Sequence, residues 1–258
     1  MKKILLLLVM ILPTMAFAAD AFDGTWKIDL KTVEFTGKPN VFELKGGMYT
    51  CQSCAPKYTI KADGTDQKVS GHSYFDTEAV TVVDANTVQF SRKLAGKDTG
   101  SNTITISADG KTMANDFTNL TGAEVVKGKS TATRLAAGPA GSHAISGTWK
   151  THVVPEYSEA GSIFVYQSTA DGLKMNWNGQ SYDAKFDGKK VLTENDPGKT
   201  WVALKRPAKD TFEETDFNDG KVTGIMKATV SADGKMMMVN FKDPRNDTTV
   251  KYTLLKQP

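Results

Sequence analysis

The chain has 258 residues, and its 32 Lys and Arg residues nearly balance its 29 Asp and Glu residues. The lysines are scattered singly among Asp and Gly, and no basic stripe is interleaved with aromatic residues. Because a nucleic-acid-binding surface needs clustered positive charge, this pattern argues against DNA or RNA as a partner.

The first residues are typical of a secretory signal peptide. Lys2 and Lys3 precede an apolar run, and small residues stand at Ala16 and Ala18. We therefore expect residues 1–18 to be removed after Ala18 and the protein to reach the periplasm or the exterior. Without them the net charge falls from +3 to +1. No later run is long enough for a transmembrane span.

Two copies of one unit follow each other in the mature chain. The tetrapeptide at 24–27, Gly-Thr-Trp-Lys, recurs at 147–150, and the pentapeptide at 107–111, Ser-Ala-Asp-Gly-Lys, recurs at 231–235. The offset is 123 at the first match and 124 at the second. Such self-similarity indicates a tandem duplication. We expect a first domain at 19–136 and a second at 145–258, joined by a linker at 137–144 that is rich in small residues.

Strands and turns account for each copy. Polar and apolar residues alternate at 103–106, Asp109 and Gly110 interrupt them, and an extended run resumes at Thr112, which predicts a hairpin. Similar runs lie at 80–83, 87–92 and 164–167, and the turn of the hairpin recurs at 231–235. Val88 and Phe90 should share one face of their strand. No stretch sustains a helical apolar period, so we predict an all-β protein of two antiparallel meander or barrel domains.

The Gly-x-Trp opening at Trp26 and Trp149 resembles the signature of the lipocalin and calycin superfamily. That resemblance implies that the indole packs across the closed end of a small barrel and that a basic residue of the last strand covers it. Arg134 stands at that place in the first copy, and Lys251 or Lys256 in the second. Segments 49–54, 62–67, 74–77 and 107–113 also resemble exported bacterial lipocalin-like proteins of unassigned activity. We expect Trp26, Trp149 and Arg134 to anchor the fold.

Cys51 and Cys54 are the only cysteines. A zinc site would need two further ligands, but the three histidines are dispersed, and a covalent haem site would need His where Ala55 stands. A thiol–disulfide oxidoreductase usually places such a pair at a helix start, whereas this pair lies between extended segments. We therefore predict a small disulfide, with redox activity as the alternative, and no metal or cofactor.

Other polar residues suggest no catalytic site. His72 has a neighbouring Ser but no nucleophile-elbow motif, so it is interpreted as a turn or surface histidine. Glu213, Glu214 and Asp216 are interpreted as a solvated face. The Asp-Gly-Lys repeats lack the ligand spacing of a calcium loop and are interpreted as turns. Alternation at 236–238 should send Met237 to the face opposite its neighbours.

The resulting hypothesis is an exported, non-enzymatic protein that binds a small apolar ligand inside a barrel. Two alternatives remain open: a structural or protein-interaction module, and a redox protein that uses Cys51 and Cys54. The identity of the ligand and the ligand-binding residues do not follow from the sequence.

Overall fold

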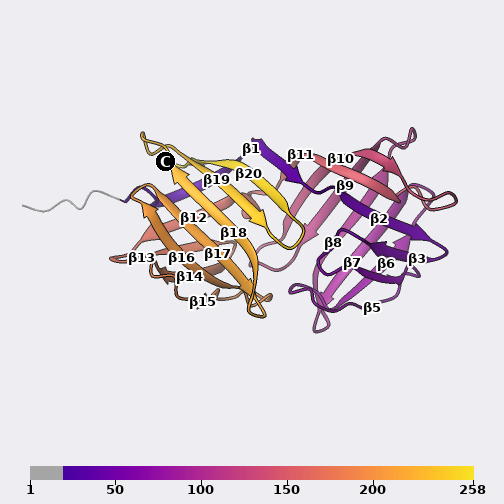
Figure 1. Cartoon of the computed structure of the whole chain (residues 1–258), viewed down its shortest axis with the longest axis horizontal. Helices are drawn as coiled ribbons and strands as arrows, with labels where there is room; N and C mark the ends of the chain where they lie inside the picture. The colour runs from indigo at the N-terminus through magenta and orange to yellow at the C-terminus, as the bar shows by residue number, and fades with distance from the viewer. Residues whose placement is uncertain (1–19) are drawn as a thin grey trace, which may run out of the picture.

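The structure is a computed structural model that describes residues 20–258, and it contains two barrel-like sheets side by side (Figure 1). The predicted signal peptide, residues 1–18, lies outside the described residues. Within residues 20–258, no helix has the length and apolar character needed to cross a membrane.

Ten strands belong to each copy of the repeat, which confirms the all-β prediction. Those of the first copy are β1 (Gly24–Gly37), β2 (Asn40–Lys45), β3 (Met48–Cys51), β4 (Tyr58–Lys61), β5 (Gln67–Lys68), β6 (Thr77–Val82), β7 (Thr87–Leu94), β8 (Lys97–Ile106), β9 (Thr112–Asn119) and β10 (Val126–Ala137). Those of the second copy are β11 (Gly147–Tyr157), β12 (Ile163–Ser168), β13 (Gly172–Trp177), β14 (Gln180–Lys185), β15 (Val191–Leu192), β16 (Trp201–Ala208), β17 (Thr211–Asn218), β18 (Lys221–Val230), β19 (Met236–Asp243) and β20 (Thr248–Lys256). Within residues 20–258 one short helix, α1 (Glu159–Ser162), follows β11.

The two sheets exchange their first strands. The order of the first sheet is β4-β3-β2-β11-β10-β9-β8-β7-β6-β5, and that of the second is β14-β13-β12-β1-β20-β19-β18-β17-β16-β15. Strand β1 of the first copy therefore pairs with β12 and β20, and β11 of the second copy pairs with β2 and β10. In Figure 1 the indigo strand β1 lies beside β20 before the chain enters β2 of the other sheet.

The connections explain this exchange. Only Lys38 and Pro39 separate β1 from β2, and the chain passes from one sheet to the other there instead of reversing in a hairpin. Proline fixes its own backbone and disfavours a compact conformation for the residue before it. The chain returns through α1 between β11 and β12. Residues 138–146, which include most of the predicted linker, join β10 to β11 within the first sheet. The boundaries of the sheets thus differ from the ranges 19–136 and 145–258 expected for the domains.

Both sheets are nearly closed. In the second sheet an isolated bridge joins Ser181, on β14, to Glu194, which lies beyond β15. In the first sheet Gly64, between β4 and β5, donates its N–H to the carbonyl of Val80 on β6. Barrel-like closure leaves little free sheet edge, as the sequence-based fold predicts.

Each tryptophan of the repeated motif anchors the core of the sheet formed mainly by the other copy. Trp26 and Trp149 are fully buried. The indole N–H of Trp26 donates to the carbonyl of Phe22 at 2.8 Å, and that of Trp149 to the carbonyl of Ile145 at 2.9 Å. Each indole therefore has its buried donor satisfied, which makes both residues effective anchors.

A cation covers each indole, as the resemblance implied, but the pairs are crossed between the copies. The guanidinium of Arg134 lies 4.0 Å from the ring centre of Trp149, not over Trp26. The ammonium of Lys256 lies 5.2 Å from the ring of Trp26. The crossing follows from the strand exchange, because β10 and β20 each lie beside the first strand of the other copy.

Local predictions of strands and turns are confirmed. The hairpin at 103–112 is formed by β8 and β9, and Gly110 has a φ of 71° in its turn. Met237 is buried in the second core, whereas Met236 and Met238 are exposed on the other face of β19.

Candidate functional site

A cavity of about 840 Å³ lies inside the first sheet and opens towards the second. Its walls come from inward-facing residues of β3, β4 and β7–β10, and its rim comes from the β17–β18 and β19–β20 ends of the second sheet. A space of this size can hold a small organic molecule.

A chain of polar side chains crosses the inner wall, with one residue from each of β4, β6, β7, β8, β9 and β10. Four of the five contacts in this chain are hydrogen bonds, and the contact between Glu78 and Arg92 is an ion pair. From one strand to the next the members are Tyr58, Glu78, Arg92, Asn102, Asn115 and Ser130.

The distances within this chain are those of good hydrogen bonds. The hydroxyl of Tyr58 donates to Glu78 at 2.7 Å, and the other oxygen of Glu78 lies 2.7 Å from Nε of Arg92. Nη1 of Arg92 donates to Asn102 at 3.0 Å, and Asn102 donates to Asn115 at 3.0 Å. Glu78 is fully buried. Because a buried charge needs a close partner, Arg92 and Glu78 hold each other in place.

Aromatic rings line the cavity between these polar groups. Tyr49 and Phe90 pack edge to face with their centres 5.1 Å apart. His72 stacks on Phe75 at 4.6 Å and meets the ring of Tyr58 at 5.2 Å. Burial raises the pKa of Tyr49 and of Tyr58 far above the usual value, and nearby Glu78 adds to both effects, so both phenols stay neutral. The lining therefore combines flat apolar faces with hydrogen-bonding groups, and its cations Arg92 and Arg245 are paired with Glu78 and Asp243.

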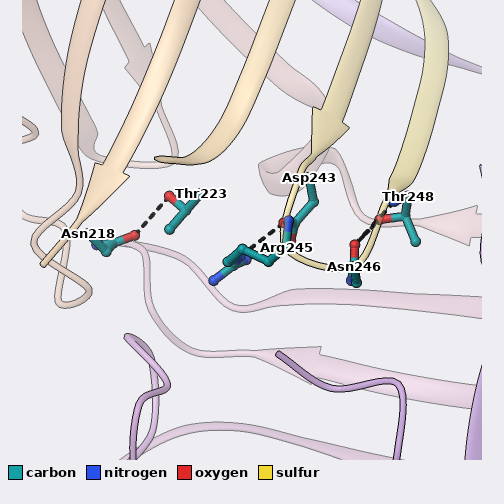
Figure 2. Close-up of polar contacts among 6 residues, drawn as sticks. All are labelled: Asn218, Thr223, Asp243, Arg245, Asn246 and Thr248. Carbon is teal, nitrogen blue, oxygen red and sulfur yellow. Dashed lines mark hydrogen bonds and ion pairs between the residues drawn. The ribbon is translucent and has the colours of Figure 1, made fainter. Parts of the chain in front are cut away.

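The second sheet supplies polar groups at the rim. Figure 2 shows Arg245 folded back onto Asp243 in the loop between β19 and β20. Nε of Arg245 donates to one carboxylate oxygen at 2.9 Å and Nη2 to the other at 2.6 Å, a bidentate pair. Asn218 accepts a hydrogen bond from Thr223 at 3.2 Å in the neighbouring loop. This part of the rim is thus pre-organised by its own contacts.

A contact near the rim ties the two sheets together. The hydroxyl of Tyr74, from the first copy, donates to Asp196 at 3.4 Å and lies 3.1 Å from the hydroxyl of Thr200. Burial and the charge of Asp196 raise the pKa of Tyr74 to about 12. The ring of Tyr74 also packs on Gly198, where an added Cβ would come within 2.6 Å of it. The close approach of the two sheets here requires glycine.

The predicted disulfide is confirmed, and it forms part of the cavity wall. Cys51 is 1% exposed at the end of β3, and Cys54 lies in the following loop. Their Cα atoms are 5.4 Å apart, within the normal range for a disulfide. The disulfide therefore fixes the loop that leads towards Tyr58.

One interpretation made from the sequence holds only in part, and another is wrong. His72 lies in the turn segment between β5 and β6, as interpreted, but it is half-buried: it packs between rings and lines the cavity. Glu214 and Asp216 are not a solvated face, because burial raises the pKa of both carboxyls, and Tyr182 donates its hydroxyl to Glu214. The polar stretch misled us because alternate residues of β17 point into the second sheet, among buried tyrosines.

Sequence reasoning missed the inward polar residues, although a signal for one of them was available. Val88 and Phe90 were assigned to one face of their strand, and strict alternation places Arg92 on that same face. An arginine on a core-facing position is a strong indication of a buried ion pair or a binding site. Alternation on β8 likewise places Asn102 on the same face as the buried residues Ile104 and Ile106.

Among the described residues, no group of three or more His, Cys, Asp and Glu side chains is placed to hold a metal ion. No protein-family model, curated protein or solved structure matches the chain. The arrangement of the cavity is therefore the main guide to function.

Proposed function

We propose that this protein is an exported, non-enzymatic, lipocalin-like module that holds one small molecule in the cavity of its first sheet. The single observation that supports the proposal most is the cavity itself, about 840 Å³ in a barrel-like sheet that its own side chains do not fill. The signal-like residues 1–18 support the export part of the proposal.

The lining refines the kind of ligand. The sequence alone predicts an apolar molecule, but Asn102, Asn115 and Ser130 line the cavity. Their side chains have donor and acceptor positions beyond those that they use among themselves. We therefore favour a ligand with both a flat ring and polar substituents.

The repeat supplies the variant for the test. Ser130 pairs with Asn115 across β9 and β10, and the equivalent pair in the second sheet is Tyr252 with Val239. Ser130→Tyr therefore places in the first sheet the residue that the second sheet already accommodates at that position, and it should fill the cavity without unfolding the sheet. Thr133→Tyr, on the exposed face of the same strand, is the matched control.

The experiment is native mass spectrometry of the full-length chain purified from the cell envelope of its own host. We expect the wild type and Thr133→Tyr to carry the same small molecule and Ser130→Tyr to have lost it. A wild type without any bound molecule, or a Ser130→Tyr variant that retains it, would contradict the proposal and favour an interaction module.

The redox alternative has a test of its own. Cys51 is nearly inaccessible, whereas an oxidoreductase must expose the attacked sulfur. We expect the purified protein not to accelerate the reduction of insulin by dithiothreitol. Acceleration that Cys51→Ser abolishes would establish redox activity instead.

A further inference from the structure

Two buried hydrogen-bonding atoms on the cavity wall have no hydrogen-bond partner among the described residues. They are Nε2 of His72, from the first copy, and Oδ1 of Asp216, from the second. Buried polar atoms in native proteins are almost always hydrogen-bonded, so each such exception needs an explanation. Their presence on one cavity suggests that the occupant of the cavity is their partner.

His72 presents an acceptor. The imidazole hydrogen-bonds to the carbonyl of Pro56, and because Nε2 has no partner this bond belongs to Nδ1. Burial lowers the pKa of His72, and the cations Arg245 and Arg92 lower it further, so the ring is neutral at neutral pH. With its proton on Nδ1, the ring offers the lone pair of Nε2.

Asp216 presents an acceptor as well. Burial, together with the neighbouring carboxyl of Asp216, raises the pKa of Glu214 well above its usual value, so Glu214 keeps its proton. The two side chains share a hydrogen bond, in which Asp216 is the acceptor. Oδ1 of Asp216 has no hydrogen-bond partner among the described residues, and Asp216 belongs to the lining of the cavity.

The charges on the lining need no charged ligand. Arg92 is paired with Glu78 at 2.7 Å, and Arg245 is paired with Asp243 at 2.6 Å. Because Glu78 is fully buried, releasing Arg92 from it to accommodate a new ion is costly. Burial raises the pKa of Asp216 and so disfavours its charged form. The unused hydrogen-bonding positions on the lining are therefore two acceptors, which favour an uncharged donor.

We propose that the ligand is an uncharged ring compound with at least two hydroxyl groups, one donating to Nε2 of His72 and another to Oδ1 of Asp216. This inference rests on the proposed function, because it assigns the polar end of the same ligand. The ligand bridges the two sheets at the mouth of the cavity, and its ring packs against the aromatic lining. Hydroxylated rings occur in both sugars and phenols, and the experiment distinguishes these sources.

The test is isothermal titration calorimetry of the full-length chain with three probes: dihydroxynaphthalene, its dimethoxy analogue and maltose. The dimethoxy analogue keeps the ring and loses both donors. We expect at least one hydroxylated probe to bind about tenfold or more tightly than the dimethoxy analogue, the effect of hydrogen bonds to buried acceptors. Tighter binding of maltose identifies a sugar site, and tighter binding of dihydroxynaphthalene identifies a phenol site.

Four variants complete the design. We expect His72→Phe, which keeps a ring on Phe75, and Asp216→Leu each to weaken the hydroxylated probe about tenfold and to leave the dimethoxy analogue unchanged. His152→Phe and Asp183→Leu replace the same residue types at exposed positions and should change neither affinity. Thermal unfolding checks each variant, and Asp216→Ala replaces Asp216→Leu if the latter does not fold.

The outcomes separate this inference from the proposed function. Equal affinity for the dihydroxy and dimethoxy probes, no binding of either hydroxylated probe, or wild-type affinity in both cavity variants overturns the inference. None of these results bears on whether a molecule co-purifies with the wild type and not with Ser130→Tyr. Failure of that co-purification experiment overturns the proposed function instead.

Discussion

The two sheets share a strand plan but differ in what occupies their interiors. At four equivalent inward positions the first sheet has Asn40, Asn102, Asn115 and Ser130, where the second has Phe164, Met226, Val239 and Tyr252. The first sheet therefore encloses a polar cavity, whereas large apolar side chains fill the same places in the second. The comparison shows that a duplicated barrel can keep one copy as a packed support and open the other for a ligand.

We expect the largest effect from exchanging the residues at the equivalent inward positions 130 and 252 of the two sheets. Tyr252→Ser should destabilise the protein by about 3 kcal/mol, because removal of a ring that packs, partly buried, against the second core leaves a cavity. Ser130→Tyr should change the free energy of unfolding far less, because the space already exists. Urea unfolding followed by tryptophan fluorescence measures both. Equal losses in the two variants would mean that the sheets are packed alike.

The cations over the two tryptophans should differ in importance. Arg134 donates to the carbonyls of Ala144 and Ser146 at 2.6 Å and also to that of Gly110, besides covering Trp149. Lys256 has only its contact with the ring of Trp26. We expect Arg134→Ala to cost about 2 to 3 kcal/mol and Lys256→Ala at most about 1 kcal/mol. Thermal unfolding of the two variants tests the difference; a larger loss for Lys256→Ala would reverse our ranking.

The disulfide is confined to the first sheet. Met175 and Asn178 of the second sheet match Cys51 and Cys54. The strand register agrees, because Cys51 pairs with Tyr58 in the first sheet and Met175 pairs with the equivalent Tyr182 in the second. Cys51→Ser combined with Cys54→Ser should therefore lower the free energy of unfolding by no more than about 2 kcal/mol, the value for so short a loop. Chemical unfolding of the double variant measures the loss. Complete unfolding would show that the first sheet, unlike the second, requires its staple.

Two neighbouring carboxyls with raised pKa values lie in the second sheet, whereas the buried carboxylate of the first sheet, Glu78, is paired with Arg92. Glu214 and Asp216 occupy the places of Phe90 and Arg92. Burial raises the folded-state pKa of both carboxyls, so their contribution to stability is complete below the usual carboxyl pKa and is lost as the pH rises through the raised values. We expect the free energy of unfolding to fall from about pH 4 upwards, by at most about 1.4 kcal/mol per pH unit for each carboxyl. Glu214→Gln should flatten this dependence, and exposed Glu213→Gln should not. A steeper fall in the Glu214→Gln variant would contradict the assignment.

Part of the candidate site could be predicted from the sequence. Cys51 and Cys54 were paired correctly because three-residue spacing and extended flanks favour a local staple. Glu214 and Asp216 are interpreted from the sequence as a solvated face because neighbouring residues are polar, and polarity in a short window does not show which face of a strand is buried. Tyr182, which donates its hydroxyl to Glu214, comes from a strand 32 residues away in the sequence.

Local chemistry in the chain determined the repeat, the strands, their turns and the depth of Trp26 and Trp149, because alternation and turn residues act over a few positions. Only the tertiary structure decided which sheet each first strand joins. Both copies begin with Gly-Thr-Trp-Lys, so either strand fits either place, and the short connection through Lys38 and Pro39 carries the chain into the neighbouring sheet. The pairing of strands from distant parts of the sequence also brings His72 and Asp216 to one cavity. Strands that are far apart in the sequence can be neighbours in a sheet, so a local sequence pattern does not predict this contact.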